Sequence, residues 1–398
     1  MADPDKFRFS IDQGGTFTDI YAEVPGKPGW EVLKILSENP GQYSDAPFEG
    51  IRRIMEQATG EPVDPDRIEW VRMGTTVATN TLLERKGART ALVITKGFGD
   101  LLQIGKQDRP EIFDLVIEKP RPIFEAVVEV DERIRLGSSE NSSKDHRFPK
   151  GISAASIEVL KAPDLDQIRK DLQRVRESGI ESLAVVLMHA YVFPDHERAI
   201  GALAKGLGFS HISLSFEVMQ RIKIVDRGQT CCVDAYLTPC LEKYSEKFLA
   251  TLKGKATGHF FMQSDGGLVS AESFLGSRAI LSGPAGGVVG YALTTYNRET
   301  GRPVIGFDMG GTSTDVSRFD GEFEWVHEAE TAGVHIQIPQ LDIRTVAAGG
   351  GSRLFYRNGM FSVGPESAGA HPGPRQPKGH STPQRPAPER RTEKTSGA

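Results

Sequence analysis

Residues 306–317 read GFDMGGTSTDVS, and residues 9–21 read FSIDQGGTFTDIY. Both stretches follow one pattern, in which an apolar strand leads into Asp-x-Gly-Gly-Thr-x-Thr-Asp and then into a second apolar strand. A Gly-Gly pair supplies the backbone freedom that a tight turn between two strands needs. The pattern therefore predicts two β-hairpins, and its repetition so far along the chain predicts two related half-domains that face one ligand.

The repeated pattern offers the chemical groups that bind a nucleotide phosphate chain. Glycines let backbone N–H groups approach phosphate oxygens closely, and threonine or serine hydroxyls add further donors. An aspartate at the strand end can hold Mg²⁺ directly or through water. The candidate phosphate-binding residues are Gly14, Gly15, Thr16 and Thr18 in the first copy and Gly310, Gly311, Thr312 and Ser313 in the second; the candidate Mg²⁺ ligands are Asp12 and Asp308.

A structural explanation competes with this functional one. A Gly-Gly hairpin with threonines as strand formers would account for a single copy of the pattern. Turn chemistry does not require the same Asp and Thr twice, so the pair favours a ligand site. Neither a GxxxxGK[ST] loop nor a GxGxxG dinucleotide fingerprint is present in this context.

Three further segments are weaker candidates. Gly74, Thr75 and Thr76 end a predicted strand and open a helix, which suits an anion, although helix capping explains the same residues. Residues 264–267 fit turn chemistry equally well. Residues 283–290 are rich in small residues and predict close packing at an interdomain hinge.

The order of predicted elements indicates an α/β protein. A strand, turn, helix and strand follow one another from residue 67 to residue 95, and the apolar run 182–188 is typical of a central strand. Residues 195–207 predict a helix beyond that strand. Residues 226–252 predict a helix with a break at Pro239.

Composition excludes several classes of function. The net charge of −5 gives no reason to expect nucleic acid or an anionic membrane as a partner, and no apolar stretch approaches the length of a membrane span. Three cysteines without a CxxC pair, and a polar start, predict a reducing, cytosolic setting. His189 and His371 are the only histidines of interest, and a structural role is the simpler reading of each. The tail at 375–398 has no large apolar residue and predicts disorder.

At these motifs the chain resembles the hydantoinase A/oxoprolinase family. The resemblance rests on DQGGTFTD, DMGGTSTDVS, MGTTVATNTLLERKG, LSGPAGGVVGY, VAAGGGSRL and ESAGAHPGP, and it extends from Phe7 to Pro374. It implies an actin/Hsp70/sugar-kinase type of ATPase, in which two RNase H-like domains close over ATP and Mg²⁺. Residues 7–215 would form the first lobe with insertions, residues 226–374 would start the second, incomplete lobe, and residues 375–398 would be the disordered tail.

The resemblance also implies an activity. Family members phosphorylate the amide oxygen of a cyclic lactam, 5-oxo-L-proline, and then hydrolyse it to L-glutamate, with Asp12 or Asp308 acting through Mg²⁺. Such enzymes serve glutathione-related metabolism and suggest a homodimer with a hydantoinase B-type half. That half is absent from this chain, so a truncated form with weak or no coupled activity is expected. The alternatives are an ATPase subunit of a hydantoinase or ketone-carboxylase type enzyme, and a non-catalytic fragment that binds a full-length partner.

Overall fold

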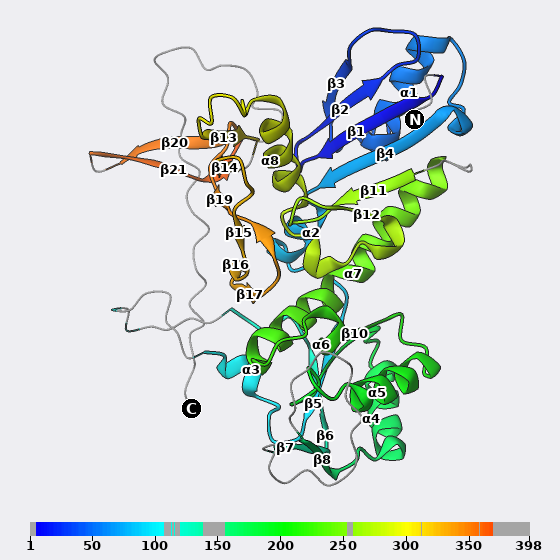
Figure 1. Ribbon diagram of the computed structural model, residues 1–398, viewed down its shortest axis with the longest axis vertical. Coiled ribbons are helices and arrows are strands. Elements are labelled where there is room, and N and C mark those ends of the chain that lie inside the picture. The colour runs from blue at the N-terminus through cyan, green and yellow to red at the C-terminus, as the bar shows by residue number, and fades with distance from the viewer. Residues whose placement is uncertain are drawn as a thin grey trace, which may run out of the picture.

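The computed structural model describes residues 5–106, 113, 115, 120–137, 156–252, 258–311, 313–357 and 359–368. The chain forms a large first lobe with an inserted α/β unit, and a smaller second lobe that contacts the first in two places (Figure 1). One is helix α8 (Ser282–Thr294), and the other is the hairpin of β16 (Ala329–Thr331) and β17 (Val334–Ile336), which packs against helix α7 (Ile224–Leu252). The expected disordered tail, residues 375–398, and His371 lie outside the described residues.

The first lobe is built on a six-stranded mixed sheet. Its order is β12 (Leu268–Ser270), β11 (Gly258–Met262), β4 (Ile68–Thr75), β1 (Phe7–Gln13), β2 (Phe17–Glu23) and β3 (Glu31–Leu36). Strands β1, β2 and β3 are antiparallel, whereas β4 is parallel to β1 and β11 is parallel to β4. This is the strand arrangement expected for an RNase H-like domain.

Helix α1 (Ala46–Thr59) covers one face of this sheet. The Asp45 side chain accepts a hydrogen bond from the Phe48 N–H at 2.9 Å and so caps the helix start, and Gly60 ends the helix with φ of 74°. Alternate residues of β1, namely Phe7, Phe9 and Ile11, are fully buried on the face that α1 covers. Successive strand residues lie on opposite faces of a sheet, so the residues that alternate with these three, including Asp12, lie on the other face of β1.

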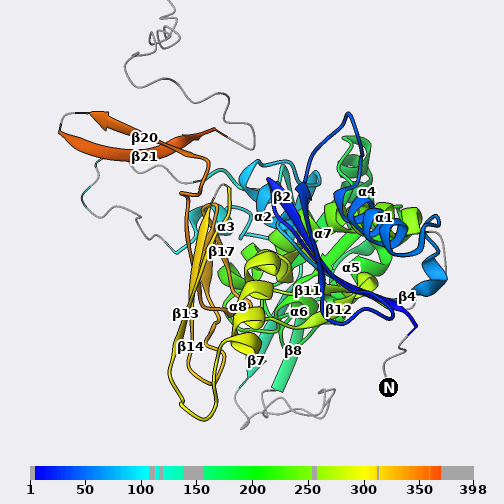
Figure 2. The ribbon, with the colours of Figure 1, turned by 90° about the horizontal axis from the view of Figure 1, so that it is seen from above.

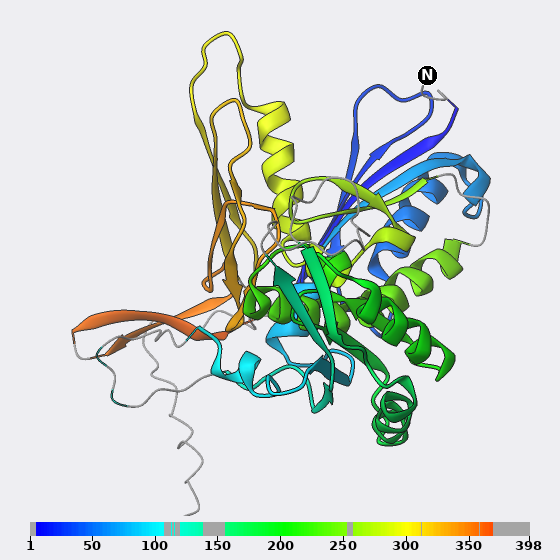
Figure 3. The same ribbon diagram turned by 60° about the horizontal axis from the view of Figure 1, so that its bottom comes forward.

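A second, fully parallel sheet is inserted between α2 (Val77–Leu83) and α7 (Ile224–Leu252). Its order is β10 (His211–Leu214), β9 (Ser182–Val186), β5 (Thr90–Thr95) and β6 (Ala126–Val130). Helices α4 (Leu165–Glu177) and α5 (Asp195–Gly206) pack on one face and α7 on the other, as Figure 3 shows. Both faces are covered, which explains the uninterrupted apolar runs of β5 and β9.

Helix α7 does not break at Pro239, so the predicted break is wrong. Proline has no N–H, and the carbonyl of Ala235 consequently loses its helical partner. The buried hydroxyl of Ser182 donates to that carbonyl at 2.6 Å. A side chain from β9 thus replaces the missing backbone bond and lets the helix continue.

The second lobe contains a three-stranded sheet of β13 (Val304–Met309), β14 (Thr314–Phe319) and β19 (Ile343–Val346). Helix α8 (Ser282–Thr294) lies between this sheet and the first one, and it contacts β4 and β11 as well as β13 and β14 (Figure 2). The second lobe therefore does not start at residue 226 as expected. Residues 224–262 complete the first lobe, because β11 pairs with β4 and α7 packs beneath it.

The second sheet is less covered than the first. Ile305 and Phe307 are 70% and 66% exposed, whereas Phe9 and Ile11, at the equivalent positions of β1, are 0% and 3% exposed. Among the described residues, the second sheet has counterparts of β1, β2 and β3 alone. This agrees with the expectation of an incomplete second lobe.

The remaining helices, strands and turns are short. They are α3 (Leu101–Ile104), α6 (Ser215–Val218), the hairpins β7 (Arg133–Gly137) with β8 (Ser156–Lys161), β16 (Ala329–Thr331) with β17 (Val334–Ile336) and β20 (Ser352–Arg357) with β21 (Met360–Ser367), the pair β15 (Trp325–Val326) with β18 (Gln340–Leu341), and 3₁₀ turns at Pro65–Arg67, Ala271–Ser273 and Gly276–Arg278. Within the described ranges, no helix combines the length and the apolarity that a membrane crossing needs.

Candidate functional site

The two copies of the repeated pattern fold into two hairpins with the same register. In the first hairpin Asp12 pairs with Asp19, and in the second Asp308 pairs with Asp315. A third strand extends each hairpin on the same side, β3 beside β2 and β19 beside β14. The prediction of two related hairpins is therefore confirmed at the level of individual residue pairs.

Each Gly-Gly loop closes by the same backbone hydrogen bond. The Gly14 N–H donates to the Phe17 carbonyl at 3.0 Å, and the Gly310 N–H donates to the Ser313 carbonyl at 2.9 Å. These two N–H groups hold the turns together, so phosphate oxygens would have to bind other donors of the loops. The predicted roles of Gly14 and Gly310 are thus better described as shaping the loops.

Neighbouring segments support each loop from behind. Ser37 donates from its hydroxyl to the Gly14 carbonyl at 2.6 Å and from its N–H to the Thr16 carbonyl at 3.0 Å. In the second hairpin, the Gly350 and Gly351 N–H groups donate to the carbonyls of Gly310 and Gly311, each at 2.9 Å. The loops are therefore held in shape before any ligand arrives, which lowers the entropy cost of binding.

The two loops touch each other. A Cβ atom added to Gly311 would lie 2.7 Å from Thr16 Oγ1 and 3.1 Å from Thr16 Cβ, closer than such atoms pack. Glycine at 311 is what allows this approach. The N-terminus of α8 lies at the same place. A Cβ atom added to Gly283 would lie 3.1 Å from Asp12 Oδ1, and one added to Gly74 would lie 3.4 Å from the Cα atom of Gly283.

Asp12 and Asp308 both lie where the two hairpins and the first turns of α8 meet, and we call this place the cleft. Asp12 retains contact with solvent, but the surrounding protein strips away much of its hydration, and this desolvation is the main reason that its pKa rises to about 6. The negative charges of Asp308, Asp19 and Asp315 raise the pKa further, and Lys34 opposes them. A site that concentrates negative charge in this way is suited to a divalent cation.

The strand-to-helix turn at 74–76 lies against the first loop. The Thr76 N–H donates to the Gln13 carbonyl at 3.1 Å, and Gly74 would meet Asp12 Oδ1 at 3.2 Å if it carried a Cβ. Thr75 is fully buried, and its N–H donates to Ser282 Oγ at 3.1 Å. This turn therefore borders the cleft. Thr76 contacts the first loop, whereas Thr75 is buried behind it.

Thr18 does not reach the cleft, contrary to the prediction. It is fully buried, and its hydroxyl lies 3.0 Å from the hydroxyl of Ser37. Successive strand residues point to opposite faces, so Thr18 must point away from the cleft if Asp19 points into it. Ser313 and Gly15 lie in the loops as predicted, the latter near Asn80, while Thr312 lies outside the described residues.

Four charged or polar residues of the cleft were missed as site candidates. They are Asp19, Asp315, Lys34 and Thr345. Asp19 and Asp315 are the last residues of the two copies of the repeated pattern. In a hairpin with a four-residue loop, Asp19 lies opposite Asp12 and Asp315 lies opposite Asp308, so the pattern itself could have identified both. No motif points to Lys34 or Thr345, because each enters through a third strand whose register the sequence does not fix.

The other predicted segments have structural explanations. Within residues 264–267, the Gly267 N–H donates to Asp265 Oδ1 at 2.9 Å, which is ordinary turn chemistry. The small residues of α8 pack between the two sheets, as predicted for residues 283–290. His189 lies in the inserted unit, away from the paired loops, and its pKa is lowered mainly by desolvation.

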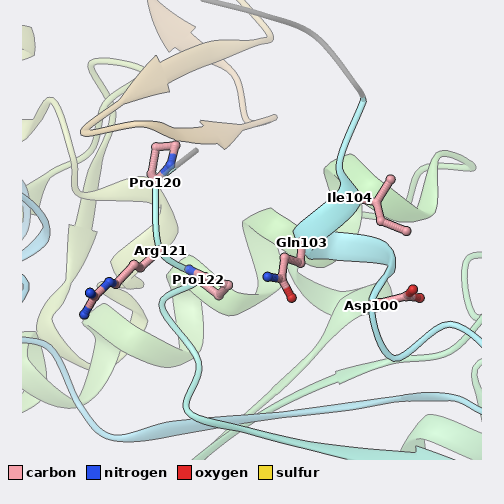
Figure 4. A pocket seen from close by; sticks show the side chains of 6 residues that line it. All are labelled: Asp100, Gln103, Ile104, Pro120, Arg121 and Pro122. Carbon is pink, nitrogen blue, oxygen red and sulfur yellow. The ribbon is translucent and has the colours of Figure 1, made fainter. Parts of the chain in front are cut away.

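A cavity of about 490 Å³ lies elsewhere, beside α3 and the four-stranded sheet in the lower half of Figure 1. Figure 4 shows its lining, with Gln103 from α3 directed toward Pro122. It contains none of the residues of the two loops. Its position separates it from the candidate site.

No set of three or more His, Cys, Asp or Glu side chains that could cage a metal ion occurs in the part of the chain that the structure describes. Mg²⁺ is usually held by one or two carboxylates together with substrate phosphates and waters. Asp12 and Asp308 are the two strand-end carboxylates that could serve as such ligands.

Two family models match most of the chain. The family model for the hydantoinase/oxoprolinase N-terminal region matches residues 8–208, and the hydantoinase/oxoprolinase model matches residues 227–384. The second match extends ten residues past Pro374, where the resemblance was expected to stop.

Individual relatives agree. The chain is 53% identical to 5-oxoprolinase 1 of Arabidopsis thaliana and 52% identical to 5-oxoprolinase of Dictyostelium discoideum, over 93% and 92% of its own length. It spans only about 30% of the length of these relatives. Its fold matches the ATP-dependent caprolactamase of Pseudomonas jessenii with a TM-score of 0.72 and 26% identity, over 92% of this chain and 52% of that one. The chain belongs to the hydantoinase/oxoprolinase family.

Proposed function

We propose that this chain binds ATP with Mg²⁺ in the cleft between its paired loops. The observation that carries the proposal is the contact of Gly311 with Thr16, which brings two equivalent hairpins and their strand-end carboxylates, Asp12 and Asp308, to one place. The N-terminus of the 13-residue helix α8 adds a positive dipole end at the same point. Phosphoryl transfer requires mainly positioning and charge neutralisation, and the cleft offers both.

We further propose that the reaction is the ATP-dependent opening of a cyclic amide, 5-oxo-L-proline, to L-glutamate. The names of the 5-oxoprolinase relatives support this substrate. An amide is a poor electrophile, and ATP supplies activation by phosphorylating the amide oxygen, after which water can cleave the C–N bond. The products are L-glutamate, ADP and phosphate. This chain spans about 30% of the relatives, so MgATP binding is proposed for the chain itself and the complete reaction for a full-length protein.

Calorimetric titration of the chain with MgATP tests the first proposal. We expect saturable binding of one nucleotide that requires Mg²⁺, and a rise in the thermal unfolding temperature when MgATP is added. Absence of both effects would contradict the proposed nucleotide site.

Phosphate release tests the second proposal. A full-length relative should release phosphate faster with 5-oxoproline than with hydantoin, caprolactam or an aryl ketone. The chain alone should show little stimulation by any of them. Equal stimulation by an unrelated carbonyl compound would count against the lactam as the substrate.

Replacing Gly311 with alanine should weaken MgATP binding about tenfold, because the new methyl group would have to push the second loop off Thr16. The matched control is Gly206→Ala at the end of α5, outside the two loops, where an added Cβ would meet no atom within 4 Å. Calorimetry on both variants compares them. Equal losses would show that the contact between the loops does not matter for binding.

A further inference from the structure

The two hairpins carry matching rows of side chains that point into the cleft. Cross-strand pairing places the members of each row side by side on one face of the sheet. The first row is Asp12, Asp19 and Lys34, and the second row is Asp308, Asp315 and Thr345. The rows agree at their first two positions and differ at the third, where the first lobe has a lysine and the second has a threonine.

The third residue of each row contacts the second. The Lys34 ammonium lies 2.6 and 2.8 Å from the two carboxylate oxygens of Asp19. The hydroxyl of Thr345 donates to Asp315 Oδ1 at 2.6 Å. The second lobe shows that a neutral hydrogen-bond donor is enough to hold such an aspartate in place. The positive charge of Lys34 is therefore not needed to maintain the hairpin.

The environment of Lys34 also argues against a purely structural role. Its side chain is 55% exposed and that of Asp19 is 39% exposed, and ion pairs this exposed contribute about 0–1 kcal/mol to folding. The ammonium also lies 5.1 Å from the centre of the Phe17 ring, at the end of the first loop. Four rotatable bonds let a lysine ammonium leave one partner for another nearby.

The charges around Asp12 are unbalanced. Four carboxylates, those of Asp12, Asp19, Asp308 and Asp315, surround the cleft, and Lys34 is the cation that acts on Asp12. A Mg²⁺ ion would neutralise part of this charge but also bring the negatively charged phosphates with it. The terminal phosphate of a triphosphate would then need a positive partner on the protein.

We propose that Lys34 is the nucleotide-binding cation of this cleft and that it contacts the terminal phosphate of a bound nucleoside triphosphate. The inference rests on the proposed MgATP site and deepens it. In the free protein Asp19 holds the ammonium beside the first loop. With nucleotide bound, Lys34 exchanges one carboxylate oxygen for a phosphate oxygen, and so distinguishes a triphosphate from a diphosphate.

Calorimetry with MgATP and MgADP tests the proposal on the wild-type chain, Lys34→Met and Lys34→Arg. We expect Lys34→Met to lose about tenfold in affinity for MgATP and less than about twofold for MgADP, since one charge-assisted hydrogen bond is removed from the triphosphate alone. Lys34→Arg keeps the charge and should recover part of the lost affinity.

The matched control is Lys27→Met. Lys27 is a similarly exposed lysine of the same lobe, 3.0 Å from Glu31, and it pairs outside the two rows. It should leave the affinities for both nucleotides unchanged. Thermal unfolding without nucleotide should be nearly the same for all the variants, which separates a binding role from a folding role.

Four outcomes would overturn the inference. If Lys34→Met bound MgATP as tightly as the wild type, or lost equally for MgATP and MgADP, the contact with the terminal phosphate would be refuted while the proposed nucleotide site stood. If Lys27→Met lost as much as Lys34→Met, the effect would be general electrostatics. If the wild-type chain bound neither nucleotide, the proposed function and this inference would fail together.

Discussion

Asp12→Asn should reduce the affinity for MgATP about 10- to 100-fold, the range typical when the surroundings of a bound metal lose one supporting group. Asparagine keeps the size of the side chain, so its fit beside Gly74 and Gly283 is retained. What it removes is one of the two strand-end carboxylates that face the cleft. Calorimetry at fixed ionic strength measures the change directly.

The same substitution should have the opposite effect on folding. The pKa of Asp12 rises to about 6 in the folded protein, from a usual value of 3.8, so its ionised form is disfavoured by folding. Stability from this group is greatest below the unfolded pKa and falls as the pH increases through 6. At pH 7.5 the neutral asparagine should therefore raise the unfolding temperature of the free chain.

Asp320→Asn is the control for Asp12→Asn. Asp320 is an exposed aspartate of the second lobe, 2.5 Å from Arg318 and outside the cleft. It should change neither the affinity nor, appreciably, the stability. An Asp12→Asn chain that bound MgATP normally would remove Asp12 from the proposed Mg²⁺ site.

Arg227→Met should lower the free energy of unfolding by about 3 kcal/mol, because it leaves buried hydrogen-bond acceptors without a donor. Arg227 is fully buried in α7, and its guanidinium donates to the Leu187 carbonyl at 2.7 Å and to Ser215 Oγ at 3.0 Å. Ser215 in turn donates to Glu197, a carboxylate that is also fully buried. Methionine would leave these acceptors without a donor and would remove the nearby positive charge that acts on Glu197.

Urea unfolding followed by circular dichroism measures this loss. Arg174→Met is the control, because Arg174 is 71% exposed and pairs with Asp171 on the surface of α4. It should change the stability by less than about 1 kcal/mol. Similar losses in the two variants would show that the buried network does not stabilise the junction between the inserted sheet and α7.

The paired hairpins could be predicted from sequence because each depends on residues close together in the chain. Gly-Gly loops and alternating strands are local signals, and the structure reproduces them at the predicted positions. The same alternation, followed one residue further, would have excluded Thr18 from the cleft and included Asp19. Polar residue type alone does not place a side chain, because neighbouring strand residues lie on opposite faces of the sheet.

The remaining errors involve partners far apart in sequence. Nothing near β11 shows that it pairs with β4, so the start of the second lobe was placed too early. Lys34 lies beside Asp19 because of the register in which β3 pairs with β2, and this register depends on how the whole sheet packs. A proline usually breaks a helix, but α7 continues through Pro239 because the Ser182 hydroxyl binds the free carbonyl of Ala235. The two residues are 53 positions apart, so no local sequence signal shows this contact.

The hydrogen bond from Ser182 to the Ala235 carbonyl has a consequence for folding during synthesis. Ser182 leaves the ribosome before Ala235 and Pro239 do, and chains generally fold from the N-terminal side as they are synthesised. Strand β9 can therefore be in place when the proline of α7 emerges. On this order of synthesis the long helix is completed against a strand that is already present, and we expect the inserted sheet to support the helix that joins it to the first lobe.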